Sequence, residues 1–487
     1  MSAERVGPRF VLCAVLGLLG GPAYAARGLE AGAGCVTITP RVDESAPPVW
    51  LAGYGQGRRA TAVHDDIYAR AFYVRDDRFS VAIVACDLIG LFRDEVLRIR
   101  QELARLDLRP PVDYVLVCST HTHAAPDTLG LWGPIGRTGI SPGYLERVRR
   151  ACVDAVRQAH ASARSAQLVI ATADVNRSGE LIGDSRLPKV IDSTMTIIQA
   201  REASGRALVT LVNVPSHPEV LGGRNTHLSS DFPSSLRQYL EERFGGTAVY
   251  TSGSIGGLLS PRVPRSDPFT NEPMPAGDLE RMTAYGRIIG RIAEKALQNA
   301  APLVGPIRVR SREFLAPVWN PFYRLGMGLR VLDRQVFDED GRPLENLAKL
   351  TPTTMPASAA TTPAWPVLCL KSEVALLQIG PLQVAAIPGE IYPELTLGRF
   401  QRPQDPAADF PEAPLEPTVF PSLRSKYRMV IGLANDEIGY IIPKSQWDWE
   451  APFAYGRKER QYGEINSCGP EVAPRLMEAF QALLTAE

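Results

Sequence analysis

A short apolar run that stops at two histidines constrains this chain more than any other stretch. Residues 113–118 are apolar and β-branched enough for a buried strand, and Pro126 and the glycine-rich segment 130–136 end regular structure. His121 and His123 therefore lie at a strand end, where the chain opens into a loop. Because residues i and i+2 of an extended segment point the same way, both imidazoles can face one cleft. The stretch predicts a site that holds a metal ion or a substrate.

Apolar runs of strand length alternate along the chain with segments whose apolar residues recur at helical spacing. This mixture predicts α/β or α+β architecture, and we adopt the α/β form, with mixed β-sheets flanked by helices. The expected helices cover 93–106, 143–161, 232–244 and 278–300. The expected strands cover 34–39, 67–74, 79–86, 113–118, 167–171, 193–199, 207–214, 247–251, 372–378, 382–387 and 427–433, with 67–74 and 79–86 forming a hairpin.

Composition places the chain among ordinary globular proteins. It has 487 residues, 45% hydrophobic and 22% charged, and its 53 basic and 53 acidic side chains leave no net charge. Nothing in this balance suggests a nucleic-acid binder, and no internal repeat is evident.

The N-terminus has the pattern of a secretory signal peptide. Arg5 and Arg9 precede the apolar run 10–19, and small residues end the segment near Ala25. The apolar run is shorter than the ~18 residues needed to span a bilayer, so a membrane anchor is the weaker alternative. We therefore expect residues 1–25 to be a signal peptide and the protein to be exported, either periplasmic or secreted.

The spacing of the cysteines defines no disulfide framework and no metal-binding motif. Cys13 lies inside the expected signal peptide, and the other six cysteines are scattered without a Cys-x-x-Cys motif. This spacing argues against a zinc finger or a redox dithiol. An even number in an exported chain permits disulfides, but several look like core thiols, and we assign no bridge.

Three loop segments stand out. Glycines at 53, 55 and 57 let the segment 50–57 approach another group closely, although a plain loop explains it equally well. The proline-rich segments 350–366 and 402–421 are expected to be ordered excursions or a mobile lid, because plausible strands lie on both sides of each.

Polar side chains follow several expected strands at the point where each strand ends. Besides His121 and His123, these are His217, Glu390 and Tyr440. A rigid sheet aims such residues into one crevice. Histidine nitrogen and carboxylate oxygen are standard zinc ligands, and a catalytic zinc usually keeps three protein ligands. The strand ends therefore allow a zinc site of two histidines and a glutamate.

Each of these residues also has an ordinary structural interpretation. A single histidine such as His217 is more often a hydrogen-bonded structural residue. Glu390 can cap a helix that begins at Ile391, and Tyr440 can be a packed aromatic. Asp231 fits the N-cap of the helix that follows it. The paired histidines carry the stronger signal.

Separated motifs occur in a fixed order along the chain: Ser119-Thr-His-Thr-His123, His217 after an apolar strand, Leu259-Ser-Pro261, Pro388-Gly-Glu390, Gly439-Tyr440, and Tyr462 with Gly469-Pro470. In this order they resemble the neutral (non-lysosomal) ceramidase family over nearly the whole mature chain. The resemblance implies a neutral-ceramidase-like α/β zinc hydrolase fold, with residues 26–487 forming the catalytic domain. The immunoglobulin-like C-terminal domain of the longer members is expected to be absent.

The resemblance also implies a function and a set of site residues. Family members are exported zinc amidases that release sphingosine and a fatty acid from ceramide. The implied cofactor is Zn²⁺, and the implied partner is a ceramide-like lipid, with peripheral contact to a membrane surface and no stable protein partner. The implied residues are the zinc ligands His121, His217, Glu390 and Tyr440, then His123 facing the scissile amide, Tyr462 near the substrate, and Ser260, which matches a serine proposed as important in the family.

The expected chemistry is coherent. An amide resists attack, and Zn²⁺ lowers the pKa of bound water toward ~7 while it polarises the carbonyl oxygen. Tyr440 could hydrogen-bond the developing oxyanion. His123 could protonate the leaving amine, because imidazole titrates near the working range of a general acid.

Two departures keep other functions open. The chain reads Gly257-Leu-Leu-Ser260-Pro where the family commonly has Gly-Asp-Val-Ser-Pro, and it reads His217-Pro-Glu219 where ceramidases proper differ. The alternatives are a non-catalytic exported binding protein on the same fold and a hydrolase of a different amide or ester. A serine esterase that uses Ser260 is a further alternative, but the Gly-x-Ser-x-Gly elbow is missing.

Overall fold

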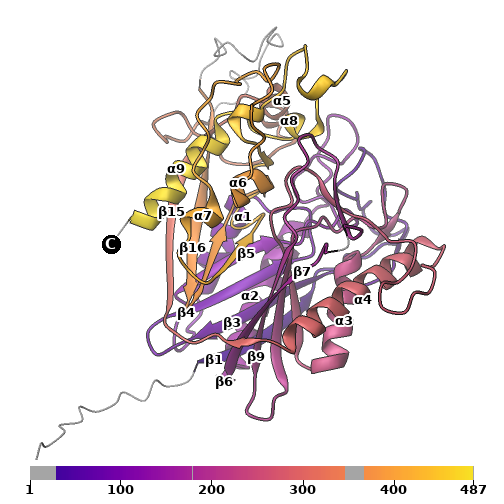
Figure 1. The fold of residues 1–487 in the computed structure, drawn as a ribbon, viewed down its shortest axis with the longest axis vertical. Coiled ribbons are helices and arrows are strands. Elements are labelled where there is room, and N and C mark those ends of the chain that lie inside the picture. Colours follow the sequence, from indigo (N-terminus) through magenta and orange to yellow (C-terminus); the bar gives the residue numbers. More distant parts are fainter. Residues whose placement is uncertain (1–28, 178, 346–366, 486–487) are drawn as a thin grey trace, which may run out of the picture.

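The computed structural model describes residues 29–177, 179–345 and 367–485, and three β-sheets form its centre (Figure 1). The first sheet has the strand order β5 (Tyr114–Ser119), β4 (Ser80–Cys86), β3 (Tyr68–Arg75), β1 (Glu30–Thr37) and β6 (Arg164–Ser165). The second has the order β12 (Thr247–Ser252), β10 (Ala207–Val214), β9 (Thr194–Arg201), β7 (Gln167–Asp174) and β14 (Ala301–Pro302). The third has the order β15 (Ile307–Pro317), β16 (Cys369–Ile379), β17 (Leu382–Ala386) and β19 (Tyr427–Ile431).

One apolar core joins the three sheets, and helices cover their other faces. Phe72 on β3, Leu211 on β10 and Leu377 on β16 belong to this shared core. Ala71 and Tyr73, the neighbours of Phe72, point the opposite way, because side chains alternate along a strand. They pack in the cluster formed with α1 (Arg93–Ala104) and α2 (Tyr144–Ala161).

The remaining sheets are covered in the same manner. Helices α3 (Phe232–Phe244) and α4 (Asp278–Leu297) pack on the second sheet, and α9 (Val472–Thr485) packs on the third (Figure 1). The short helices are α5 (Pro321–Gly328), α6 (Pro393–Leu397), α7 (Val419–Ser422) and α8 (Tyr462–Ile465). The α/β prediction is confirmed.

Parallel strand pairs bring distant parts of the chain to the same place. Strands β4 and β5 are parallel, as are β10 and β12, and β17 and β19. Two-residue strands β18 (Glu390–Ile391) and β20 (Tyr440–Ile441) also pair in parallel and set Glu390 directly opposite Tyr440. The other small pairs are β2 (Ala62–Val63) with β11 (His227–Leu228), and β8 (Ile182–Asp184) with β13 (Leu259–Pro261).

All the expected strands and helices are present, with ends that differ by a few residues. The helix expected over 93–106 ends at Ala104, and the one expected over 278–300 ends at Leu297. The expected 67–74 and 79–86 hairpin is β3 with β4. Five of the six cysteines after the signal segment are buried and all six are free thiols, with Cys86 Sγ and Cys152 Sγ 3.3 Å apart.

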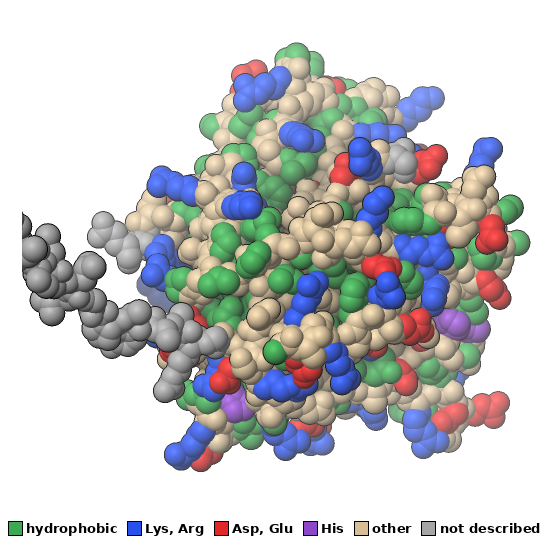
Figure 2. Space-filling view, turned by 60° about the horizontal axis from the view of Figure 1, so that its bottom comes forward, with side chains coloured by type: hydrophobic (Ala, Val, Ile, Leu, Met, Phe, Trp, Pro, Cys, Tyr) green, Lys and Arg blue, Asp and Glu red, His purple; other side chains and the backbone are tan. Residues whose placement is uncertain are grey.

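The proline-rich segment 402–421 is an ordered loop. Glu416 Oε1 accepts from the Lys444 backbone N–H at 2.8 Å, and Asp409 Oδ2 accepts from that of Trp449 at 2.8 Å. The expected signal peptide and the segment 350–366 lie outside the described residues. No helix within the described ranges is long and apolar enough to cross a membrane. Figure 2 shows basic and acidic side chains intermixed over the face it draws, in keeping with the zero net charge.

Candidate metal centre

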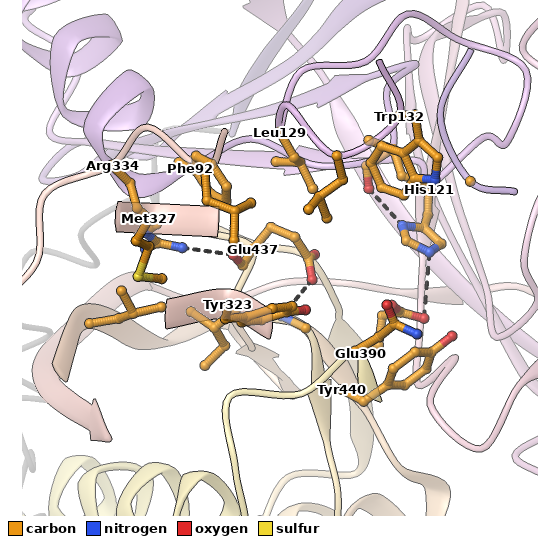
Figure 3. Close-up of a pocket in the computed structure, with 18 of the residues that line it drawn as sticks. Phe92, His121, Leu129, Trp132, Tyr323, Met327, Arg334, Glu390, Glu437 and Tyr440 are labelled. Carbon is orange, nitrogen blue, oxygen red and sulfur yellow. Dashed lines mark hydrogen bonds and ion pairs between the residues drawn. The ribbon is translucent and has the colours of Figure 1, made fainter. Parts of the chain in front are cut away.

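The turn after β5 aims His121 into the interior. His121 has a left-handed backbone (φ 67°), which a non-glycine residue adopts at some cost and which is often found at functional sites. Its Nδ1 lies 2.6 Å from the carbonyl oxygen of Ile89. Its Nε2 faces Glu390, 3.4 Å from Oε2 (Figure 3).

His217 is held in the same way from the end of β10. Its Nδ1 lies 2.8 Å from the carbonyl oxygen of Leu259, and its Nε2 lies 2.9 Å from Glu390 Oε2. A carbonyl oxygen can only accept, so Nδ1 of His121 and of His217 carries the hydrogen. In the neutral imidazoles, both Nε2 lone pairs then point at the same carboxylate.

The arrangement of His121, His217 and Glu390 is electrostatically favourable only with a positive charge at its centre. Burial alone would lower the pKa of His217, but the Glu390 carboxylate raises it to about 9. Burial alone would raise the pKa of Glu390, yet His121 and His217 hold it well below its usual range. Two lone pairs and a carboxylate oxygen repel one another unless a proton or a metal cation lies among them.

His123 completes a cluster of three imidazoles. Its ring centroid lies 5.0 Å from that of His121 and 5.5 Å from that of His217. The three histidines can each offer a nitrogen within 4.8 Å of the others, and neither ring nitrogen of His123 has a hydrogen-bond partner. Burial and the charges of the other two histidines lower the pKa of His123 well below its usual value.

Two tyrosines lie beside this cluster. Burial raises the pKa of the Tyr440 hydroxyl well above its usual value, and the Glu390 carboxylate next to it adds to the effect. The Tyr440 ring packs edge-on against Tyr462, with centroids 6.1 Å apart. Tyr462 is half exposed, so it lies at the outer side of the site.

Ser260 is bound to a carboxylate rather than to a histidine. Its hydroxyl donates to Glu219 Oε1 and lies 3.3 Å from the Leu258 carbonyl oxygen. A serine nucleophile needs a base that takes its proton, and in esterases this is usually a histidine. The geometry therefore does not favour the serine esterase alternative.

The residues fit a zinc ion by their donor chemistry. His121, His217 and Glu390 present two imidazole nitrogens and one carboxylate oxygen, which is a common catalytic zinc set. The outer nitrogens of both histidines donate to backbone carbonyls, as in most zinc sites. Tyr440 and His123 are the two neighbours that can take a fourth position.

An apolar pocket leads away from the histidines (Figure 3). His121, His123, Glu390 and Tyr440 line one end, and Tyr462 also contributes to its wall. The rest of the wall is mainly apolar and includes Phe92, Leu129, Leu131, Trp132, Met327, Leu332 and Leu370. An extended hydrocarbon group bound here would place its polar end at the histidine cluster.

The sequence patterns did not single out several polar residues of this region. Glu219 lies beside His123, and Tyr54 contacts both. Glu437 lines the pocket, and burial together with the charge of Glu390 raises its pKa well above the usual value. Two signals were available in the sequence: the three glycines of segment 50–57 and the unusual Pro-Glu219 after His217.

The other structural interpretations can now be compared with the geometry. Glu390 caps no helix, because α6 begins at Pro393 with Tyr392 as its N-cap. Asp231 is the N-cap of α3, as expected, and accepts the Phe232 backbone N–H at 2.7 Å.

The fold and the donor cluster define an α/β protein with a site of the kind found in metal-dependent hydrolases. Residues 30–258 match the family described as neutral/alkaline non-lysosomal ceramidase, N-terminal. This match covers a little under half of the chain, and it agrees with the resemblance to neutral ceramidases drawn from the sequence motifs.

Two solved structures share the fold of nearly the whole chain. One is a neutral ceramidase from Pseudomonas aeruginosa, with a TM-score of 0.67 and 18% identity over 94% of this chain and 74% of that one. The other is a ceramidase complexed with C2, with a TM-score of 0.66 and 17% identity over 94% and 75%. No curated protein sequence matches the chain. The family match and the fold support the predicted class of enzyme, a hydrolase of linear amides of the ceramidase type.

Proposed function

We propose that this protein is a zinc-dependent amidohydrolase that cleaves the N-acyl amide bond of ceramide or of a ceramide-like N-acyl lipid. In this proposal, His121, His217, Glu390 and Tyr440 hold the zinc ion. His123 and Tyr462 contact the substrate. The single observation that carries the proposal is the convergence of His121 Nε2 and His217 Nε2 on Glu390 Oε2 at one end of an apolar pocket.

Zinc bound at this site would supply a Lewis acid for the amide carbonyl and a nucleophile derived from water. The protein groups supply the rest. The Tyr440 hydroxyl lies beside Glu390, where it can donate to the oxygen of the tetrahedral intermediate. His123 can carry a proton to the amine nitrogen as the C–N bond breaks.

The pocket supports a lipid as the substrate. Its side chains Phe92, Leu129 and Met327 offer apolar surface to a hydrocarbon chain, and their burial excludes water from the amide (Figure 3). A ceramide has two such chains that meet at the amide. We propose that one of them occupies this pocket while the amide lies against His123 and Tyr440.

The cellular setting remains part of the same proposal. Residues 1–25 serve as a signal peptide, residues 26–487 form the catalytic domain, and the protein is exported to the periplasm or the medium. A lipid substrate requires peripheral contact with a membrane surface during the reaction.

The experiment is an assay of purified protein against N-acyl sphingosines, N-acyl amino acids and simple esters, with metal analysis of the same sample. We expect about one zinc per chain, release of fatty acid from N-acyl sphingosine, loss of activity on chelation and recovery with zinc. Zinc binding without turnover of any substrate would identify the non-catalytic binding protein instead. Preferred turnover of another amide or ester would retain the enzyme but replace its substrate.

A further inference from the structure

His123 is enclosed on the side that faces away from Glu390. Its Nδ1 lies 3.3 Å from Glu219 Oε2, and the Tyr54 ring packs edge-on against the imidazole, with centroids 4.9 Å apart. Gly53 closes the same side: a Cβ at this position would lie 2.4 Å from His123 Cγ, and the backbone there is left-handed (φ 98°). The glycine in segment 50–57 thus gives room to the His123 ring.

Glu219 is itself held at both carboxylate oxygens. The Tyr54 hydroxyl donates to Oε2 at 3.1 Å, and the Ser260 hydroxyl donates to Oε1. Both donors come from segments far from Glu219 in the sequence. A carboxylate fixed in this way keeps Oε2, which has a further lone pair, beside His123 Nδ1.

The backbone around both residues is also tied down. The N–H groups of Val220 and Leu221 each donate to the Asp231 carboxylate at 3.0 Å, which fixes the turn that carries Glu219. The His123 backbone N–H donates to the Pro218 carbonyl at 3.2 Å. The turn after β10 therefore positions His217 on one side and Glu219 on the other.

We propose that Glu219 is a positioning residue for His123 in the reaction proposed above, on which this inference rests. Glu219 Oε2 lies 3.3 Å from His123 Nδ1 without a formed hydrogen bond in the structure, and in the reacting enzyme it accepts the Nδ1 hydrogen, which fixes the tautomer with Nε2 turned toward the metal donors and the scissile amide. Tyr54 and Ser260 act one step further out, by holding the Glu219 carboxylate. This assigns Ser260 a role that involves no nucleophilic attack.

The test compares Glu219→Ala, the isosteric Glu219→Gln and Ser260→Ala with a control, Glu412→Ala, at an exposed position. Glu219→Ala should lower kcat by about 10- to 100-fold with little change in KM. Glu219→Gln retains an oxygen acceptor and should recover part of the loss. Ser260→Ala should lose less than Glu219→Ala, and the control should match the wild type.

A double variant separates positioning from a general structural effect. If Glu219 acts through His123, the His123→Ala/Glu219→Ala protein should be no slower than His123→Ala alone. Multiplicative losses in the double variant would overturn the inference. Equal kcat of Glu219→Ala and wild type would overturn it as well.

Cobalt in place of zinc provides a readout besides activity. The visible spectrum of the cobalt form reports the ligand set, so it should be the same in Glu219→Ala and wild type. Loss of the metal from Glu219→Ala or Glu219→Gln would show that Glu219 acts on the metal site rather than on His123, and would contradict the proposal. Absence of amidase activity in the wild type is a different result, because it removes the proposed function itself.

Discussion

Two buried polar clusters lie at the ends of the neighbouring parallel strands β4 and β5, and they differ in how charge is balanced. Asp87, after β4, accepts hydrogen bonds from Arg237 Nη1 and Nη2 at 2.8 and 2.9 Å, and from Ser230 Oγ at 2.9 Å. This cluster contains its own cation. After β5, the Nε2 atoms of His121 and His217 face the Glu390 carboxylate, which pairs with no arginine or lysine among the described residues, so the positive charge of this cluster comes from a proton on histidine or from a bound cation.

The difference teaches how to separate a structural cluster from a functional one. A buried ion pair with all its acceptors filled stabilises one arrangement of the chain and has no capacity to bind anything else. Donors that converge without a fixed counter-charge can take up a metal ion. Both clusters are buried at strand ends, and they differ in charge balance and in the pocket that opens from the histidine cluster.

The largest expected effect is on the cluster formed by His121, His217 and Glu390. His121→Ala and His217→Ala should each lose zinc and reduce turnover by more than the roughly 10- to 100-fold that loss of an outer partner costs. His123→Ala should keep zinc and still lower turnover, because its proposed contact is to the substrate. Mass spectrometry measures the zinc content of each variant, and a steady-state assay measures its kcat. Loss of zinc from His123→Ala with retention in His121→Ala would reverse our assignment of the two residues.

Changes to the cluster formed by Asp87 and Arg237 should lower the stability of the protein and leave its activity unchanged. Arg237→Met leaves the Asp87 carboxylate buried without its cation, and we expect the free energy of unfolding to fall by about 3–5 kcal/mol. Urea denaturation measures this change. The folded fraction should retain zinc and turnover. Arg157→Met, at an exposed ion pair, serves as the control and should change stability by less than about 1 kcal/mol. Loss of zinc from folded Arg237→Met would mean that the two clusters are coupled.

A third buried carboxyl sharpens the comparison through the pH dependence of stability. Burial raises the pKa of Glu394 to about 8, from an ordinary value of 4.5. The charge of Arg186 lowers this pKa by less than burial raises it, so Glu394 retains its proton at neutral pH. The protonated Glu394 carboxyl contributes its full stabilisation below about pH 4.5. This stabilisation is lost as the pH rises toward 8, because Glu394 ionises at a lower pH in the unfolded chain than in the folded protein.

Glu394→Gln should therefore remove part of the pH dependence of stability. Between pH 5 and pH 8 the wild type should lose at most about 1.4 kcal/mol per pH unit from this group, and the variant should lose less. Urea denaturation at both pH values measures the slope. Glu412→Gln, at an exposed position, should leave the slope unchanged. An identical slope in Glu394→Gln and wild type would show that Glu394 is ionised in the folded protein.

Much of the fold was predictable because its strands and long helices carry strong local patterns. The 113–118 run is β5, and the helix expected over 143–161 is α2 with ends only one residue different. His121 and His123 were found at a strand end for the same reason. Local apolar periodicity determines which segments are buried, and the ends follow from it.

The contacts of the site were not predictable from local patterns. Glu390 meets Tyr440 through two-residue strands, which are too short to produce a periodic signal. Glu219 reaches His123 only because the turn after β10 is folded back by Asp231. Such contacts join residues far apart in the sequence, and a single sequence does not record which distant residues meet.

A crystal structure of the zinc-loaded protein, with anomalous scattering measured on both sides of the zinc absorption edge, tests the central claim most directly. The account predicts one strong anomalous peak bonded to His121 Nε2, His217 Nε2 and Glu390 Oε2, with Tyr440 completing the ligands and His123 outside them. An anomalous peak located elsewhere, or none at these three atoms in fully zinc-loaded protein, would contradict it.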